Sequence, residues 1–105
     1  MKDVRIIVTG GTIYKVHDAK SEGLAFAQDG STHIPEVLRV GRCHFPVVEL
    51  LMLKDSLLFE DADREAIAEA VGRAAEDGIV VTHGTGTMGE TARFLEGRNP
   101  GKTVV

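Results

Sequence analysis

The sequence predicts a single α/β domain with a mainly parallel sheet, of the three-layer Rossmann or flavodoxin type. Two short β-branched runs, residues 4–9 and 79–82, are apolar almost throughout, which is typical of strands buried on both faces of a parallel sheet. Each run ends in a glycine-containing loop, and a strong helical pattern lies between the two runs. Strands that alternate with helices in this way form parallel sheets.

The composition fits one compact core. The chain has 105 residues, of which 43% are hydrophobic and 27% charged, with a formal net charge of -4, and this disfavours disordered and membrane-spanning classes. The acidic balance argues against a nucleic-acid partner. The apolar run before Gly10 is too short for a signal peptide or a membrane span, so we expect no membrane partner and a cytoplasmic protein. Cys43, the only cysteine, cannot form an internal disulfide.

Residues 4–9 are predicted to form the first strand, which Gly10 and Gly11 end. Residues 14–32 show no clear periodicity and carry further glycines, so we predict a long, mobile loop of the kind that often binds or covers a ligand. Pro35 fits the first turn of a short helix over residues 36–39.

Residues 44–53 are apolar but ambiguous between core and contact surface, with core favoured. Pro46 lies in this run and argues against a central strand, although it allows an edge strand or a strand start.

The clearest helix is predicted from Ala62 to Glu76, because small apolar residues recur there at helical spacing. We expect Asp61 to cap its start and Gly78 to stop it. The apolar stripe consists of Ala62, Ala66, Ile67, Ala70, Val71, Ala74 and Ala75.

A second helix is predicted from about Met88 to Glu96, after the strand at 79–82. Thr87 and Glu90 have the spacing of a capping box at its start. An apolar run begins at Thr103, and the sequence stops inside it. We therefore expect the chain to be a fragment or truncation of a longer domain.

Two segments share the pattern V-T-x-G-T, namely residues 8–12 and 81–85. Each follows a buried strand, so each lies where open α/β sheets bind ligands, at the carboxyl ends of the strands. If the two strands are close in the sheet, Thr12 and Thr85 face one crevice.

Such a pair of loops can support nucleophilic chemistry. The glycines at 11, 84 and 86 let the backbone approach a ligand and present its N–H groups. A threonine hydroxyl becomes a nucleophile when a base removes its proton, and amides at the following helix start can hold an oxyanion. Taken alone, each loop also fits a simpler role as a tight turn with a helix cap. No complete phosphate-binding motif is present.

The motifs resemble a known family. Thr9-Gly10-Gly11-Thr12-Ile13 matches the first signature of the bacterial-type asparaginase and glutaminase family, and residues 78–88 are similar to its second, whose core reads H-G-T-D-T. Lys54-Asp55-Ser56 resembles the family segment whose serine binds the substrate's α-carboxylate. The order and spacing agree across nearly all of the chain, which looks most like the short asparaginase-domain proteins that lack a second domain.

The resemblance implies roles for individual residues. Thr12 would attack the side-chain amide of L-asparagine, Thr85 would be the second catalytic threonine, and Ser56 would hold the carboxylate. The products would be L-aspartate and ammonia, formed through an acyl-enzyme. The resemblance also implies a homo-oligomer, and it implies no metal and no organic cofactor.

The chain departs from the family pattern in ways that leave three functions open. Gly86 stands where the family has an aspartate that binds the substrate's amino group, and losing such a group costs about 10²–10⁴ in rate. The family's catalytic lysine would lie beyond Val105. The chain is therefore an asparaginase-type hydrolase of normal or weak activity, a non-catalytic domain that binds an amino acid or a partner, or the ammonia-releasing part of an amidotransferase. For His83 we favour an orienting hydrogen bond in the loop over a general base.

Overall fold

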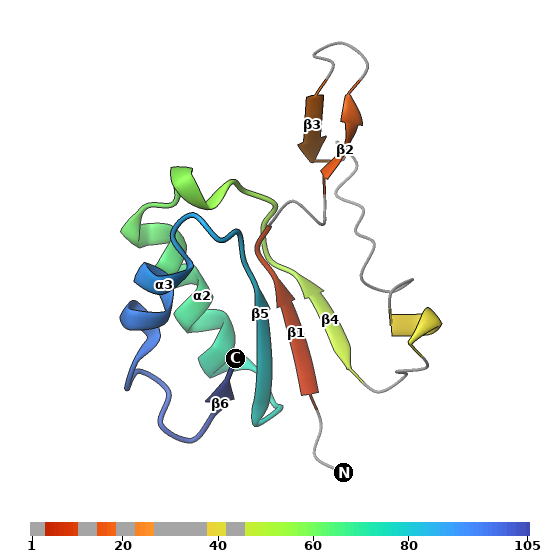
Figure 1. The fold of residues 1–105 in the computed structure, drawn as a ribbon. Helices are drawn as coiled ribbons and strands as arrows, with labels where there is room; N and C mark the ends of the chain where they lie inside the picture. The colour runs from red at the N-terminus through yellow and green to blue at the C-terminus, as the bar shows by residue number, and fades with distance from the viewer. Residues whose placement is uncertain (1–3, 11–14, 19–22, 27–37, 42–45) are drawn as a thin grey trace.

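The computed structural model describes residues 4–10, 15–18, 23–26, 38–41 and 46–105. Its centre is a four-stranded parallel sheet with the strand order β4-β1-β5-β6 (Figure 1). The predicted α/β class with a mainly parallel sheet is confirmed. The strands are β1 (Val4–Val8), β4 (Val47–Leu50), β5 (Gly78–Thr82) and β6 (Thr103–Val104).

Strand β1 lies between β4 and β5, so the two V-T-x-G-T segments leave the same edge of the sheet side by side. The register pairs Val8 with Thr82, whereas Val81 pairs with Ile7. The two motifs are therefore offset by one residue. Because successive side chains point to opposite faces of a sheet, the equivalent strand residues Val8 and Val81 do not share a face.

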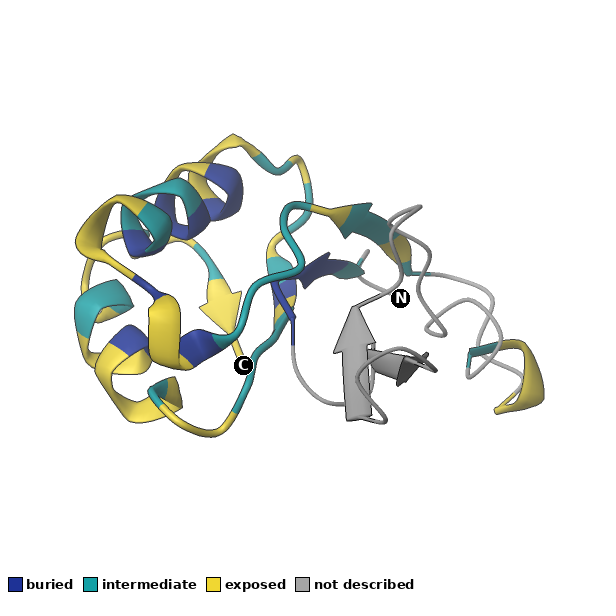
Figure 2. Ribbon diagram, turned by 90° about the horizontal axis from the view of Figure 1, so that it is seen from above, coloured by how far each residue is buried: buried dark blue, intermediate teal, exposed yellow. Residues whose placement is uncertain are grey.

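Helices α2 (Asp61–Arg73) and α3 (Met88–Leu95) cover one face of the sheet (Figures 1 and 2). Ile7 of β1 and Ile79 of β5 point into this layer and pack against Ile67 of α2, and all three are almost completely buried. Burying a side chain of this size stabilises the fold by about 1.5–3 kcal/mol. Small residues on α2 let the helix come close to the strands.

The other face of the sheet is covered more thinly. Residues 38–40 are helical, and Leu38 packs against Ile6 and Val8. This helical turn lies on the side of the sheet opposite to α2 and α3, which gives the three predicted layers (Figure 2). It agrees with the end of the expected helix at 36–39, whereas residues 36 and 37 lie outside the described part of the chain.

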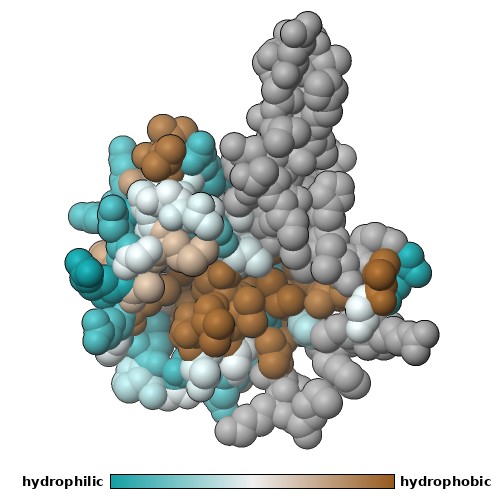
Figure 3. All heavy atoms as spheres, in the orientation of Figure 1, coloured by the Kyte–Doolittle hydropathy of each residue, from teal (hydrophilic) through white to brown (hydrophobic). Residues whose placement is uncertain are grey.

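Apolar side chains remain exposed on the sheet, and Figure 3 shows apolar atoms gathered across it. In the part of the chain that the structure describes, no helix is both long enough and apolar enough to cross a membrane. The exposed apolar side chains of the strands are Val47, Leu50, Val80 and Val104.

The prediction of a loop over residues 14–32 is wrong for eight of them. Strands β2 (Lys15–Asp18) and β3 (Gly23–Phe26) form a separate antiparallel pair, in which Val16 lies opposite Ala25. Each strand is only four residues long, too short for its alternation to be distinguished from loop sequence. The pairing is local, from Lys15 with Phe26 to Asp18 with Gly23, and it satisfies backbone N–H and C=O groups of both strands.

The ambiguous run at 44–53 contains an edge strand followed by core residues. Strand β4 begins directly after Pro46 and lies at the outside of the sheet, as a proline at a strand start allows. Leu51 and Met52 then pack against the core beneath α2, and Leu53 packs against the opposite cluster.

Helix α2 is shorter than predicted at its C-terminal end. Its first residue is Asp61 and its N-cap is Glu60, one residue before the expected cap. It ends at Arg73, where Ala74 turns into an extended conformation, so Gly78 begins β5 and does not stop the helix. Ala62, in the first turn of the helix, and Ala75, beyond its C-terminal end, are exposed, so the predicted stripe is too long at both ends.

Asp63 fixes the start of α2. Its carboxylate accepts hydrogen bonds from the backbone N–H of Glu60 at 2.8 Å and from Nζ of Lys54 at 2.9 Å. The hydrogen bond from Lys54 and the one from the Glu60 backbone lower the pKa of Asp63 below its ordinary value of 3.8. The helix start is thereby joined to the segment that follows β4.

Replacing Asp63 by asparagine keeps an oxygen that can accept from Glu60 but removes the charge. A carboxyl group whose pKa is lower in the folded state stabilises the fold at neutral pH, and this contribution is lost as the pH falls through the folded-state pKa. We expect Asp63→Asn to lower the free energy of unfolding by about 0.5–1 kcal/mol at pH 7. The two proteins should converge below about pH 3.8 in urea titrations, and a difference independent of pH would contradict this account.

Gly10, directly after β1, has a backbone conformation that other residues rarely adopt. Its φ is 142°, and a Cβ at this position would lie 2.3 Å from the carbonyl oxygen of Lys54. We expect Gly10→Ala to lower the free energy of unfolding by at least about 2 kcal/mol through backbone strain and overpacking. Gly89 in α3 is the matched control, since no atom lies within 4 Å of a Cβ there.

Gly89→Ala should leave stability unchanged or raise it by up to about 1 kcal/mol, because alanine is the better helix former. Urea denaturation of the two variants measures both effects. Equal stability of the two alanine variants would show that the approach of Gly10 to Lys54 does not constrain the fold.

Candidate functional site

The candidate site lies at the edge of the sheet where β1 and β5 end. Thr9 is completely buried there, and its hydroxyl donates a hydrogen bond to the carbonyl oxygen of Thr82 at 2.5 Å. Its backbone N–H donates to the same oxygen at 3.3 Å. These two contacts hold the start of both glycine-containing loops together.

The segment after β4 crosses this edge and brings Ser56 to the site. The backbone N–H of Lys54 donates to the carbonyl oxygen of Thr9 at 3.1 Å. The next residues form a 3-10 helix, η2 (Ser56–Leu58), which Asp55 caps by accepting from the N–H of Leu57 at 3.0 Å. Lys54 and Asp55 therefore both make structural contacts, Lys54 with Asp63 of α2 and Asp55 with the first turn of η2.

Ser56 lies directly against the loop that follows β5. Only 3% of its surface is exposed, and its Oγ is 2.9 Å from the position of a Cβ at Gly84 and 3.2 Å from that at Gly86. A side chain at either glycine would meet the Ser56 hydroxyl. Three sequence-predicted site residues, Ser56, Gly84 and Gly86, therefore lie together, and Thr85 is exposed between the two glycines.

Gly11 and Thr12 lie outside the described residues, as does Cys43. The placement of Thr12 opposite Thr85, and the catalytic and substrate-binding roles of the predicted residues, stay predictions. Within the described part of the chain, no group of three or more metal-ligating side chains comes together.

Thr87 has a contact that its sequence pattern did not predict. Its hydroxyl donates to the carbonyl oxygen of Ser56 at 2.8 Å, so it joins the loop to η2. As the N-cap of α3 it makes no side-chain capping bond, and the predicted capping box with Glu90 is wrong. Glu90 instead contacts Arg64 of α2, with Oε2 3.4 Å from Nη2.

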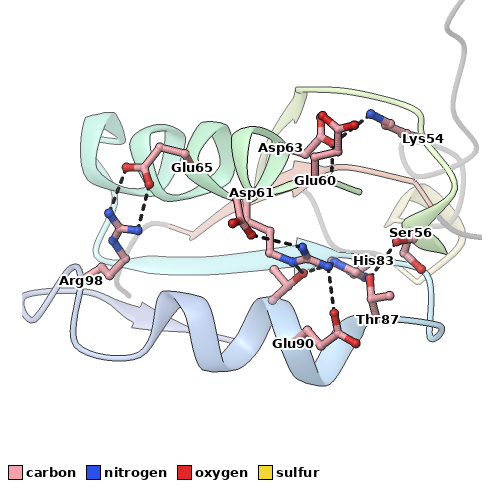
Figure 4. A network of polar contacts seen from close by, with 12 residues as sticks. Lys54, Ser56, Glu60, Asp61, Asp63, Glu65, His83, Thr87, Glu90 and Arg98 are labelled. Carbon is pink, nitrogen blue, oxygen red and sulfur yellow. Dashed lines mark hydrogen bonds and ion pairs between the residues drawn. The ribbon is translucent and has the colours of Figure 1, made fainter. Parts of the chain in front are cut away.

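His83 orients the loop, as predicted. Its Nδ1 is 2.6 Å from the carbonyl oxygen of Gly84, and its ring makes an edge contact with Phe59 at a centroid distance of 4.9 Å. Its Nε2 is 2.8 Å from Oγ1 of Thr91, which also accepts from Nε of Arg64 at 3.1 Å (Figure 4). Nothing in the sequence near Arg64 or Thr91 indicated this network, because the two helices meet only in the fold.

Gly86 has an apolar neighbour where a side chain would extend. A Cβ at Gly86 would lie 2.7 Å from Cδ2 of Leu57, which is 71% exposed. The contact is with the end of a flexible, solvent-exposed side chain, so a larger residue at position 86 requires Leu57 to change rotamer.

A separate hollow of about 520 Å³ lies between α3 and the strands β5 and β6. It includes His83 but neither Ser56 nor the residues from Gly84 to Gly86. Its walls are mainly apolar, so we assign the candidate site to the polar edge described above. Its apolar lining includes Val81, Met88, Ala92, Leu95, Val104 and Val105.

At this edge lie the buried residue Ser56, the exposed residue Thr85 and two glycines, Gly84 and Gly86, which have no side chain to cover the backbone. Backbone N–H groups at the start of α3 add positive potential for an anion. These groups can bind a carboxylate and stabilise an oxyanion during acyl transfer.

Comparisons with curated proteins point to components of amidotransferases. The chain is 36% identical over 100 residues to a component of the glutamyl-tRNA(Gln) amidotransferase of Methanococcus maripaludis, and 36% identical over 100 residues to the corresponding protein of Methanococcus vannielii. In both cases the match covers 90% of this chain but only 23% of the relative.

Comparisons with solved structures point to asparaginases. The L-asparaginase of Thermococcus kodakarensis matches with a TM-score of 0.67 and 27% identity, over 89% of this chain and 29% of that one. A probable cytoplasmic L-asparaginase of Campylobacter jejuni matches with a TM-score of 0.68 and 31% identity, over 90% and 30%. Residues 3–105 match the family described as "Asparaginase, N-terminal". The chain belongs to the asparaginase family and corresponds to its N-terminal domain.

Proposed function

We propose that this chain carries the ligand-binding edge and the reactive hydroxyls of an asparaginase-type amidohydrolase. The observation that carries this proposal is the contact of the Ser56 hydroxyl with Gly84 and Gly86 at the end of β5. Segments from two separate parts of the sequence meet there, and family membership supports the same assignment. Ser56 would bind the carboxylate of an amino-acid ligand, L-asparagine or L-aspartate.

In the proposed reaction, Thr12 attacks the carbonyl carbon of the side-chain amide after losing its proton to a base. The base returns this proton to the amide nitrogen, so the C–N bond of the tetrahedral intermediate breaks with release of ammonia and leaves an ester between Thr12 and the acid. Water then hydrolyses this ester, so one L-asparagine and one water give one L-aspartate and one ammonia. Thr85 is proposed to orient the water or relay the proton, with backbone N–H groups holding the oxyanion.

Gly86 limits the proposed activity. A carboxylate at this position could pair with the ammonium group of an amino acid, whereas the structure has Leu57 beside it. An ammonium group loses hydration beside an apolar side chain without gaining a partner from it, which weakens binding. A weak hydrolase, or a domain that binds the amino acid without turnover, is consistent with this environment.

A second candidate is the ammonia-releasing part of an amidotransferase. The identity of 36% to the archaeal relatives favours it. The chain spans about a quarter of those relatives, so their full activity and their partners are proposals for this protein. This candidate requires a partner that accepts the ammonia, whereas the first requires only water and the amide. For either one we propose a cytoplasmic protein that self-associates.

Calorimetric binding of L-aspartate and ammonia release from L-asparagine and L-glutamine test the proposal. We expect Ser56→Ala to weaken aspartate binding by about tenfold, because a hydrogen bond to a charged group is lost. Thr12→Ala and Thr85→Val should lower any ammonia release by about 10²–10⁴, while Thr85→Ser retains the hydroxyl and most of the rate. A natural chain that binds neither aspartate nor asparagine contradicts the proposal.

The combination Gly86→Asp with Leu57→Ala supplies a carboxylate together with room for it. We expect this double variant to bind aspartate more tightly than Gly86→Asp alone, since a Cβ at position 86 meets Leu57. Leu57→Ala alone is the matched control, because it removes the apolar side chain without supplying a carboxylate, and it should bind aspartate less tightly than the double variant. If the single and double aspartate variants both bind no better than the natural chain, position 86 does not face the amino group of the ligand.

A further inference from the structure

We propose that Arg64 is a positioning residue, which acts through Thr91 and His83 to fix the peptide between Gly84 and Thr85. The three side chains come from α2, from α3 and from the end of β5, and they form one continuous chain of hydrogen bonds (Figure 4). The expected effect of these hydrogen bonds on ligand binding rests on the proposed function, whereas the positions of their hydrogens can be tested without any ligand.

The direction of every hydrogen bond in this chain follows from chemistry. A guanidinium has only N–H donors, so Nε of Arg64 donates to Oγ1 of Thr91. A carbonyl oxygen only accepts, so Nδ1 of His83 carries the hydrogen that faces Gly84. In the neutral imidazole Nε2 then has a lone pair, and the Thr91 hydroxyl, 2.8 Å away, donates to it. The arrangement therefore selects a single tautomer of His83.

Burial makes this arrangement stiff. Thr91 is 3% exposed and Arg64 is 7% exposed, so water competes little for their hydrogen bonds. The guanidinium is also close to the carboxylates of Glu90, at 3.4 Å, and of Asp61, at 3.9 Å, both of which lie in solvent. These carboxylates balance the charge of Arg64 and leave its Nε directed at Thr91. The His83 ring is held from another side by Phe59.

The last hydrogen bond of this series, from His83 to the Gly84 carbonyl, reaches the candidate site. In a trans peptide the C=O and the N–H point in opposite directions, so the His83 contact with the Gly84 carbonyl also fixes the direction of the Thr85 N–H. Thr85 is exposed in the loop beside Ser56, and under the proposed function its N–H is one of the backbone donors that would hold the ligand. A hydrogen bond that begins on α2 thus determines how a backbone donor of the site is presented.

The first test measures the ¹⁵N signals of the His83 ring in the full chain, in mildly alkaline buffer where imidazole is neutral. His83→Asn assigns the signals among the four histidines. We expect a protonated Nδ1 and an unprotonated Nε2. A natural chain in which Nε2 carries the hydrogen overturns the proposal without reference to any variant or ligand.

The second test compares Thr91→Val, which keeps the shape but removes the hydroxyl, with Thr91→Ser, which keeps it. Thr91→Val removes the hydroxyl that donates to Nε2, so it should raise the fraction of His83 that carries its hydrogen on Nε2 and weaken L-aspartate binding about tenfold, while Thr91→Ser retains both properties. The matched control is Arg98→Gln, which breaks an exposed arginine contact to α2, where Arg98 binds Glu65 at 2.9 and 3.0 Å. Arg98→Gln should change neither the tautomer of His83 nor the affinity for L-aspartate.

The outcomes separate this inference from the proposed function. If the natural protein binds no aspartate, the proposed function fails. The ¹⁵N signals of His83 still test the hydrogen bonds between Arg64, Thr91 and His83 in that case. If aspartate binds but Thr91→Val leaves both tautomer and affinity unchanged, the proposed function stands and the positioning role of Arg64 fails. If Thr91→Val does not fold, Arg64→Lys provides the same comparison, because lysine has no Nε donor at this position.

Discussion

The pairing of β1 with β5, closed by the contact of Thr9 with the Thr82 carbonyl, is the constraint on which the rest of the structure depends. The end of β1 also accepts hydrogen bonds from the segment after β4, through the carbonyl oxygens of Val8 and Thr9. Backbone groups of three segments thus meet at one buried position. Because a buried, unpaired N–H or C=O is costly, each segment is fixed by the others. This junction therefore determines where the site residues lie.

Helix α2 supports both sides of the site from its first turn. Asp63 reaches Lys54 on the segment before Ser56, while Arg64 reaches Thr91 beneath the loop after β5 (Figure 4). Adjacent residues on a helix point about 100° apart, so neighbours in the sequence can serve two different segments. The alanine-rich middle of the helix brings this turn close to the sheet. The same helix therefore contributes core packing along its length and polar contacts at its start.

The parallel sheet and its two main helices could be predicted from the sequence because their signals are local. The β-branched runs at 4–9 and 79–82 are apolar almost throughout, and the spacing of Ile67, Ala70 and Val71 is helical. Pro46 correctly restricted its segment to an edge. The pairing of β2 with β3 was not predictable in this way because each strand has only four residues, and the register offset between the two motifs depends on the pairing of β1 with the distant β5.

The candidate site was predictable in its location but not in its supporting contacts. Loops after parallel strands meet at one edge, which is why the two V-T-x-G-T segments could be grouped from the sequence, whereas Ser56 was assigned to the same site only through the family resemblance. Thr87 has the spacing of a capping residue, yet its hydroxyl contacts Ser56, because the tertiary partner competes with the local one. Arg64 has the sequence environment of an exposed helical residue, and only the packing of α2 against α3 makes it a buried member of the network.

The central claim is that Ser56 and the loop after β5 form one ligand site. Its most direct test is a titration of the ¹⁵N-labelled chain with L-aspartate, followed through the backbone amide signals. The account predicts that signals of Ser56 and of residues 84–87 move together with one saturation curve, while those near Arg98 and Glu65 stay in place. Saturable shifts confined to other parts of the chain, with Ser56 and residues 84–87 unmoved, would contradict it.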